Sequence, residues 1–227
     1  MNAIARLNMI AEGQTEETFI RDLLQEPLAH RRVYVQVCCV ETRRKQGRVY
    51  RGGMTTYGKA KRDMQRWLLE DKTAYLTTMF DLYKLPTDFP GLAQVKNFGD
   101  PYQKVMHLEE SLAADIADSR FIPYIQLHEF EGLLFSDVQA LDAILKGPHN
   151  RSLLTRLQQI RAQFKTPEEI NDGETTAPSK RLQRLYPGYD KILFGPLIAQ
   201  HIGLDRLRQE CPHFRDWLLK LEALVAA

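Results

Sequence analysis

The amino-acid sequence predicts an α/β fold: a mostly parallel sheet of about four strands flanked by helices, with a helical extension at the C-terminal end. Two observations carry this prediction. Over the first 137 residues, short apolar segments alternate with segments of helical spacing, which is the pattern of β–α–β units. From about residue 138 only helical spacing remains. We therefore expect an α/β domain over 1–137 and a helical extension packed on it over 138–227.

The strands are expected where runs of Ile, Leu, Val, Met and aromatic residues have strand length, at 4–11, 33–40, 74–81 and 121–128. Helices are expected where apolar residues recur every three to four positions, at 15–29, 55–70, 101–119, 138–146, 150–163, 167–171, 178–185, 190–203 and 212–225. Thr15 is the expected N-cap of the first helix. The basic, glycine-containing segment 43–53 is expected to form a loop.

Composition narrows the class of protein. The chain has 227 residues and a net charge of +2, which by itself does not indicate a nucleic-acid-binding protein. Its basic residues nevertheless crowd the first third, which favours a basic lobe. The three cysteines fit neither a disulfide framework nor a paired zinc motif, so a reducing cytoplasm is expected. We expect no signal peptide, no membrane span and no P-loop, so the chain is not its own P-loop ATPase.

Carboxylates follow three of the expected strands. Glu12 follows the first strand, Asp81 ends the third, and Glu129 and Glu131 follow the fourth. The carboxyl ends of parallel strands lie at one edge of a sheet, where α/β proteins bind ligands, so these acids are expected to converge. Converging carboxylates repel one another, and oxygen ligands suit Mg²⁺ or Mn²⁺ better than zinc. The sequence therefore predicts a site for Mg²⁺ or Mn²⁺.

A structural alternative stays open at the first of these acids. Glu12 could be a surface turn residue, with Thr15, Glu16 and Glu17 capping and charging the start of the first helix. The three acidic strand ends favour the metal site over this alternative.

Three motifs carry a resemblance to a known family. The segment Glu12–Glu16 resembles the Glu-Gly-x-Thr-Glu opening of Toprim domains in overcoming-lysogenization-defect (OLD) type nucleases. The segments His128–Phe135 and Pro178–Leu182 are similar to motifs of a Toprim-like family of unknown function, domain of unknown function 4276. The resemblance spans nearly the whole chain, and the middle motif is the more specific because it is long and unusual. It implies a Toprim-like form of the predicted sheet.

The resemblance also implies an activity and a partner. It implies a Toprim-type phosphodiester-cleaving domain in which Glu12 and Asp81 are catalytic metal ligands, with Glu129 or Glu131 as a further acid. Relatives of this kind often stand beside a gene for an ABC-type or AAA-type ATPase in anti-phage defence, so the resemblance implies a partner ATPase as well. Glu16 is a further candidate metal ligand.

The sequence departs from the Toprim pattern after the third strand. Toprim domains carry Asp-x-Asp there, whereas this chain has Asp81-Leu82-Tyr83. The candidates for the missing acid are Glu16, Asp88 and Glu131. Alternatively, a single ion binds firmly, or the domain has kept its fold and lost catalysis.

Basic residues near the third motif are candidates for phosphate binding. Lys180 lies in the first turn of an expected helix and could hold the scissile phosphate, with Arg181, Arg184 and Lys191 in support. An ordinary basic helix face is the alternative. His128 abuts the acids and could ligate metal or carry a proton, although a strand-end histidine is more often structural.

The basic segment near the second strand is a candidate nucleic-acid contact. Flexible basic segments supply affinity for the phosphate backbone without reading sequence. The alternative is a solvated loop. The residues concerned are Arg43, Arg44, Lys45, Arg48 and Arg51.

Two functions follow from these observations. The first is a divalent-metal-dependent nuclease acting on DNA or RNA, with an ATPase partner. The second is a non-catalytic Toprim-like module that binds nucleic acid or a partner ATPase and regulates it. The sequence leaves homo-oligomerisation open.

Overall fold

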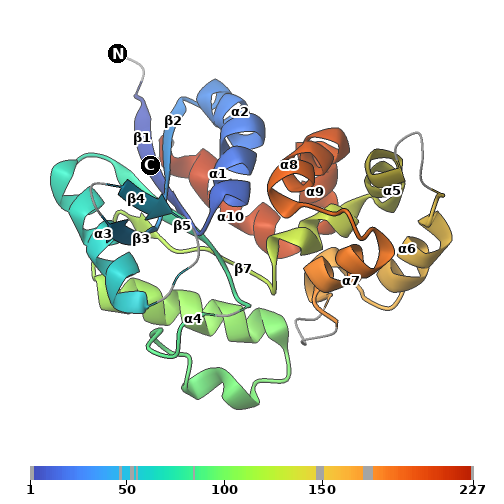
Figure 1. Ribbon diagram of the computed structural model, residues 1–227. Helices are drawn as coiled ribbons and strands as arrows, with labels where there is room; N and C mark the ends of the chain where they lie inside the picture. The colour runs from blue at the N-terminus through green and yellow to red at the C-terminus, as the bar shows by residue number, and fades with distance from the viewer. Residues whose placement is uncertain are drawn as a thin grey trace.

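The computed structural model describes residues 3–45, 48–51, 54, 56–83, 85–146, 151–170 and 176–225, with only the backbone described over 41–51. Its centre is a parallel sheet of five strands in the order β2-β1-β5-β6, with β7 pairing β5 beyond the end of β6 (Figure 1). The strands are β1 (Ala5–Ala11), β2 (Val33–Cys39), β5 (Tyr75–Asp81), β6 (Phe121–Ile122) and β7 (Ile125–Gln126). The predicted α/β class and parallel sheet are confirmed.

The expected fourth strand is divided in two. β6 pairs with the first half of β5 and β7 with the second half. Pro123 lies between them, and proline has no N–H to donate to a strand ladder, so the pairing is interrupted there.

The helices that follow β1 and β2 lie close to their expected places. The first comprises α1 (Gln14–Phe19), a π-helical segment (Ile20–Leu24) and α2 (Gln25–His30), and α3 spans Tyr57–Glu70. The expectation for Thr15 was wrong: Gly13 is the N-cap, and Thr15 is buried inside the first turn. Thr15 lies there because its side chain faces the packed helix α8 rather than the helix end.

The basic segment is not the expected loop. It forms an antiparallel hairpin of β3 (Glu41–Lys45) and β4 (Arg48–Arg51), in which Arg43 pairs with Tyr50 and Lys45 with Arg48. Composition predicted a loop because the segment is charged, but strand pairing depends on register and not on charge.

The remaining helices are α4 (Pro101–Ile116), α5 (Val138–Lys146), α6 (Leu154–Arg161), α7 (Pro178–Leu185), α8 (Lys191–Ile202), α9 (Leu204–Glu210) and α10 (Pro212–Glu222), with 3₁₀ turns at Gln94–Asn97, Phe130–Ser136, Pro167–Glu169 and Ala223–Val225. The expected helix at 167–171 is the third of these turns. α9 is not among the predicted helices. It starts after Gly203, whose φ of 82° ends α8.

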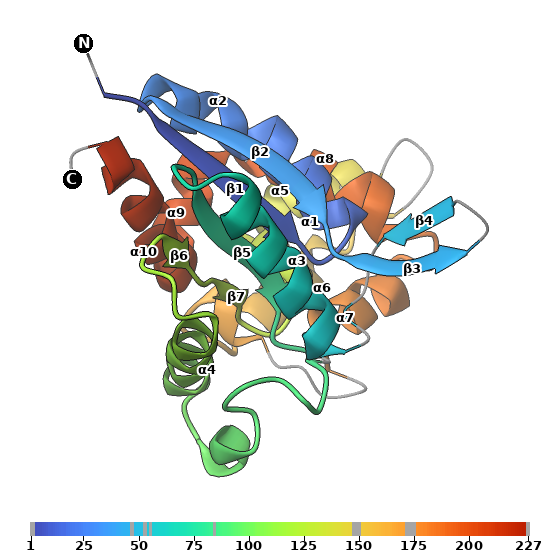
Figure 2. The same ribbon diagram turned by 90° about the vertical axis from the view of Figure 1, so that its left-hand side faces the viewer.

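Helices cover both faces of the sheet (Figure 2). Each face carries its own hydrophobic cluster. One face packs against α3 and α4 through residues such as Met64 and Leu108. The other packs against α1, α2 and the helices after residue 137. Trp217 of α10 stacks on Tyr124 at 4.2 Å and donates from Nε1 to Thr77 Oγ1 at 2.9 Å. The helical extension thus completes one face of the sheet. The boundary at 137/138 stays a prediction.

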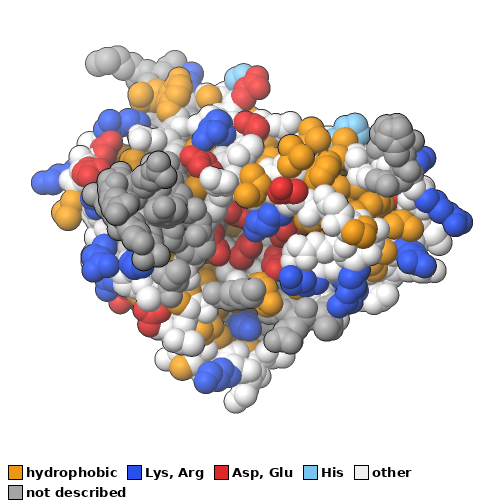
Figure 3. All heavy atoms as spheres, in the orientation of Figure 1, with side chains coloured by type: hydrophobic (Ala, Val, Ile, Leu, Met, Phe, Trp, Pro, Cys, Tyr) orange, Lys and Arg blue, Asp and Glu red, His pale blue; other side chains and the backbone are white. Residues whose placement is uncertain are grey.

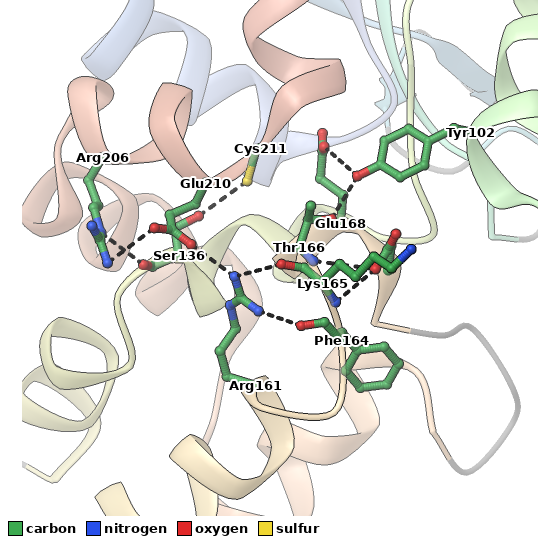
Figure 4. A network of polar contacts seen from close by, with 11 residues as sticks. Tyr102, Ser136, Arg161, Phe164, Lys165, Thr166, Glu168, Arg206, Glu210 and Cys211 are labelled. Carbon is green, nitrogen blue, oxygen red and sulfur yellow. Dashed lines mark hydrogen bonds and ion pairs between the residues drawn. The ribbon is translucent and has the colours of Figure 1, made fainter.

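A buried carboxylate fixes the start of α10. Both oxygens of Glu168 accept from backbone N–H groups of that helix, from Phe214 at 2.9 Å and from His213 at 3.0 Å. Tyr102 donates to the same carboxylate at 3.3 Å, as Figure 4 shows. Within the described part of the chain, no helix is long and apolar enough to cross a membrane.

Candidate active site

Glu12 and Asp81 lie together at the carboxyl edge of the sheet. Because β1 and β5 are neighbours in the sheet, the residues that follow them meet. The backbone N–H of Asp81 donates to Glu12 Oε2 at 3.0 Å, and Asp81 Oδ1 accepts from the N–H of Phe130 at 2.9 Å. The structure therefore brings the first two predicted acids together and ties them to the turn Phe130–Ser136.

Two further predicted acids join this cluster. Glu16 lies in the first turn of α1, four residues after Glu12, and is 2% exposed. Glu131 lies in the turn after β7 and is 1% exposed. Oε1 of Glu131 has no hydrogen-bond partner among the described residues. We call Glu12, Glu16, Asp81 and Glu131 the carboxylate cluster.

The electrostatics of the cluster show the mutual repulsion of its members. The pKa of Glu12 is raised to about 7, first by burial and then by the charge of Glu16. Burial likewise raises the pKa of Asp81 well above its usual range, and Glu16 and Glu12 raise it further. For Glu131, burial raises the pKa to about 7, and Glu129 and Glu16 add to the shift. Several acids with raised pKa values at one edge of a sheet are a pattern typical of functional sites.

A lysine supplies positive charge to the cluster. Lys191 is the first residue of α8, and its Nζ lies 3.6 Å from Glu16 Oε1. Its charge lowers the pKa values of Glu12, Asp81 and Glu131. Burial would lower the pKa of Lys191, but attraction to Glu16 and Asp81 outweighs it and raises that pKa. Figure 3 shows acidic side chains gathered in a hollow near the centre of this face.

No local feature of the sequence indicates that Lys191 lies among acids, because the packing of α8 places it there. A Cβ added at Gly195 would lie 3.0 Å from Thr15 Cγ2 and 3.1 Å from Phe130 Cε1. The missing side chain lets α8 approach α1 and the turn Phe130–Ser136 closely. Lys191 had been expected to bind phosphate, and that role stays a prediction.

Of the three candidates for the missing Toprim acid, two lie in the cluster and one does not. Asp88 accepts from the backbone N–H of Tyr57 with both oxygens, at 3.0 and 3.1 Å, so it caps α3 instead. Glu16 and Glu131 remain. Tyr83, at the position of the missing acid, donates its backbone N–H to His128 O at 2.8 Å.

Glu129 and His128 have structural contacts beside the cluster. Glu129 accepts from the backbone N–H of Ser179 at 2.9 Å and from its hydroxyl at 3.1 Å, so it holds the first turn of α7. His128 is buried and has a φ of 60°, which turns the chain between β7 and the acids. Metal binding by either residue, and proton transfer by His128, stay predictions.

The predicted phosphate-binding residues of α7 contact residues of their own helix and of neighbouring segments. Lys180 is exposed and donates to Gln183 Oε1 at 3.4 Å on the same helix. Arg181 donates to Thr176 O at 2.6 Å, and its guanidinium lies 5.8 Å from the centroid of the Phe164 ring. The side chains of the basic hairpin, Arg43, Arg44, Lys45, Arg48 and Arg51, lie outside the described ones.

The cluster fits a hard divalent cation in its chemistry and not in its present geometry. Its donors are carboxylate oxygens, which Mg²⁺ and Mn²⁺ prefer, and Glu131 Oε1 is a buried acceptor without a hydrogen bond. Among the described residues, however, no three or more His, Cys, Asp or Glu side chains are placed to hold a metal ion. Binding an ion therefore requires these side chains to rearrange.

Comparisons with known proteins agree with the fold. Over 98% of its length the chain is similar to the whole C-terminal region of the OLD protein of Burkholderia pseudomallei, with a TM-score of 0.52 and 16% identity. The C-terminal region of the Xanthomonas campestris pv. campestris OLD protein, phased with platinum, matches with a TM-score of 0.42 and 18% identity, covering 95% of each chain. A comparison with curated proteins found no significant match. The model of the family described as "Domain of unknown function (DUF4276)" matches residues 11–222. The chain belongs to the DUF4276 family and has a Toprim-like fold, that of the OLD C-terminal region.

Proposed function

We propose that this protein is a divalent-metal-dependent nuclease of Toprim type that hydrolyses phosphodiester bonds in DNA or RNA. The observation that carries the proposal is the carboxylate cluster. Its four acids come from the end of β1, α1, β5 and the turn after β7, and burial, together with their mutual repulsion, raises the pKa values of three of them. Burying carboxylates close together lowers the stability of the folded protein, so their presence supports a role in binding and catalysis.

Mg²⁺ or Mn²⁺ would be held by Glu12, Glu16, Asp81 and Glu131. When bound, the ion would shield the negative charge of the phosphodiester and lower the pKa of a bound water. The chain's own contribution is proton transfer and charge. Before an ion binds, the pKa of Glu12 is about 7, so its carboxyl group can take up or release a proton near neutral pH. Lys191, beside Glu16, supplies a positive charge to a bound phosphate, and Lys180 is a second candidate.

The likeness to OLD proteins supports a partner. The matched region is the C-terminal part of a longer protein, as its description says. We propose that an ABC-type or AAA-type ATPase works with this chain, in anti-phage defence. The basic hairpin Glu41–Arg51 is the proposed contact with the nucleic-acid backbone.

Cleavage assays test this proposal. Plasmid, single-stranded DNA and RNA are incubated with the protein and Mg²⁺ or Mn²⁺, with and without the partner ATPase. We expect cutting that EDTA abolishes and that Glu12→Gln or Asp81→Asn reduces on the order of 100-fold or more. Each change keeps a hydrogen-bond acceptor and removes only the charge. Glu110→Gln, on the exposed side of α4, is the matched control and should cut like the wild type.

Two results would contradict parts of the proposal. Metal-dependent cutting that survives both substitutions would show that the chemistry lies elsewhere. Absence of cutting even with the ATPase would favour the second function, a non-catalytic module, which the tyrosine at position 83 of the Asp-x-Asp pattern already supports.

A further inference from the structure

The contacts of Lys191 point to regulation of the metal site. Its ammonium group is the positive partner of Glu16, whose carboxylate is 2% exposed, and it attracts Asp81, Glu131 and Glu12 as well. Buried carboxylates that are ionised are stabilised by a nearby positive charge. In the structure, a side chain of the protein provides that charge.

The side chain of Lys191 is also able to move out of the carboxylate cluster. Its side chain is 44% exposed, so Nζ has a path to solvent by rotation about its own stem. One backbone hydrogen bond is missing after the first turn of α8, because Pro196 has no N–H to donate to the carbonyl of Ile192. Asp190 caps that turn by accepting from Ile192 N at 2.9 Å. The body of the helix is held by the close approach at Gly195.

A divalent ion and this ammonium group would seek the same oxygens. Both are cations, and each draws its stabilisation from the cluster's carboxylates, so the two repel each other when both are present. The described residues show no group arranged for a metal, while Lys191 is in place. Occupation of the carboxylates by the Lys191 ammonium group accounts for both observations.

We propose that Lys191 is a built-in counter-cation that competes with the divalent ion, so that ion binding is coupled to withdrawal of Lys191 from the carboxylate cluster. This inference rests on the metal binding of the proposed function, but not on cleavage. Because coupling between two ligands is reciprocal, whatever draws Lys191 away, such as the phosphate of a nucleic acid, also tightens ion binding. The site thereby loads its metal preferentially when substrate is present.

Calorimetric titration with Mn²⁺ tests the proposal without any cleavage. We expect Lys191→Met to bind Mn²⁺ about tenfold more tightly than the wild type, within the usual range of coupling between sites. Lys191→Arg keeps the charge and should stay within about threefold of the wild type. Lys220→Met, an exposed lysine of α10, is the matched control and should bind as the wild type does. Binding that appears only in Lys191→Met would support the proposal equally.

Thermal melts check that the variants fold and give a second signature. In EDTA, Lys191→Met should melt below the wild type, because the carboxylates lose their counter-charge, and saturating Mn²⁺ should raise its melting temperature by more than it raises that of the wild type. Equal or weaker Mn²⁺ binding by folded Lys191→Met overturns the proposal. So does the result expected for a simple phosphate ligand, namely weaker nucleic-acid binding with unchanged Mn²⁺ affinity.

The failure of this inference is distinguishable from the failure of the proposed function. If Lys191→Met shifts the Mn²⁺ affinity but the protein never cuts nucleic acid, the counter-cation role of Lys191 stands and the nuclease proposal fails. If cutting depends on Glu12 and Asp81 but Lys191→Met leaves the Mn²⁺ affinity unchanged, the nuclease proposal stands and the counter-cation role fails.

Discussion

The backbone N–H of Asp81 donates to Oε2 of Glu12 across 3.0 Å, so the Glu12 carboxylate is held against the end of the neighbouring strand β5. Glu12 therefore has a structural role, accepting this hydrogen bond, as well as its proposed role in metal binding and catalysis. Glu12→Ala leaves the Asp81 N–H without its acceptor and should lower the free energy of unfolding by about 1–3 kcal/mol. Glu12→Gln keeps an acceptor oxygen and should not. Urea denaturation at pH 7 measures both, and equal losses for the two variants would contradict the role of this hydrogen bond.

Glu131 should make the metal-free protein less stable at high pH. Its pKa of about 7 lies above the ordinary 4.5, so folding favours the protonated form. This stabilising contribution is complete below about pH 4.5 and is lost as pH rises through 7, to an extent on the order of 3 kcal/mol. Glu131→Gln should reduce this dependence by the contribution of Glu131 and be the more stable protein at pH 8. Urea denaturation in EDTA from pH 5 to about pH 8 measures it.

Exposed Glu110 provides the control for that series. Glu110→Gln should keep the pH dependence of the wild type. A Glu131→Gln protein whose unfolding free energy follows the wild-type pH dependence would show that Glu131 is ionised at no cost.

An acid at position 83 should strengthen metal binding. Tyr83 follows Asp81 by two residues and is half-buried beside the cluster, where Toprim domains carry their second aspartate. Tyr83→Asp should tighten Mn²⁺ binding severalfold and lower metal-free stability, because it adds an oxygen ligand and a further negative charge. Tyr83→Asn has the same shape without the charge, so the difference between the two variants in calorimetry isolates the charge. Identical Mn²⁺ affinities would place position 83 outside the site.

Glu168 should be among the more sensitive positions for stability. It is fully buried, and each of its oxygens accepts a backbone N–H at the start of α10. Glu168→Ala leaves both donors unsatisfied and should cost about 3 kcal/mol or more of unfolding free energy. Glu168→Gln should also destabilise, since its amide nitrogen meets one of the two donors. Chemical denaturation followed by Trp217 fluorescence reports it, and a loss below about 1 kcal/mol would speak against the cap.

The basic hairpin should determine how nucleic-acid affinity depends on salt. Replacing both Arg43 and Arg48 with alanine should weaken binding similarly for different sequences and reduce the slope of log affinity against log salt by about 2. Fluorescence anisotropy between about 50 and 200 mM KCl measures this slope. The control replaces Arg215 and Lys220 of α10 with alanine, and a slope unchanged in the hairpin variant would leave the hairpin without a binding role.

Much of the fold was predictable because hydrophobic spacing is a local signal. The predicted helices at 138–146 and 178–185 have the observed bounds, Val138–Lys146 and Pro178–Leu185, and the second of them starts at a proline, which suits a first helical position. The interruption at Pro123 and the hairpin after β2 were not predicted. Both depend on which strand lies alongside, and that is decided by tertiary pairing.

The same distinction holds for the candidate site. The convergence of Glu12, Asp81 and Glu131 could be expected from sequence, because parallel strands share one carboxyl edge. The position of Lys191 could not, since it depends on how closely α8 packs against Thr15 at Gly195. Asp88 looked as eligible as Glu16 in the sequence, and only the structure shows that it caps a helix.

The stacking of Trp217 on Tyr124 bears on how the protein is made. The sheet strands are synthesised first, but the face around Thr77 and Tyr124 is covered by a helix that leaves the ribosome much later. Until Pro212–Glu222 emerges, the nascent chain carries this apolar surface open to the cell. This face of the sheet, and with it the support for the carboxylate cluster at its edge, is therefore complete only after α10 has docked.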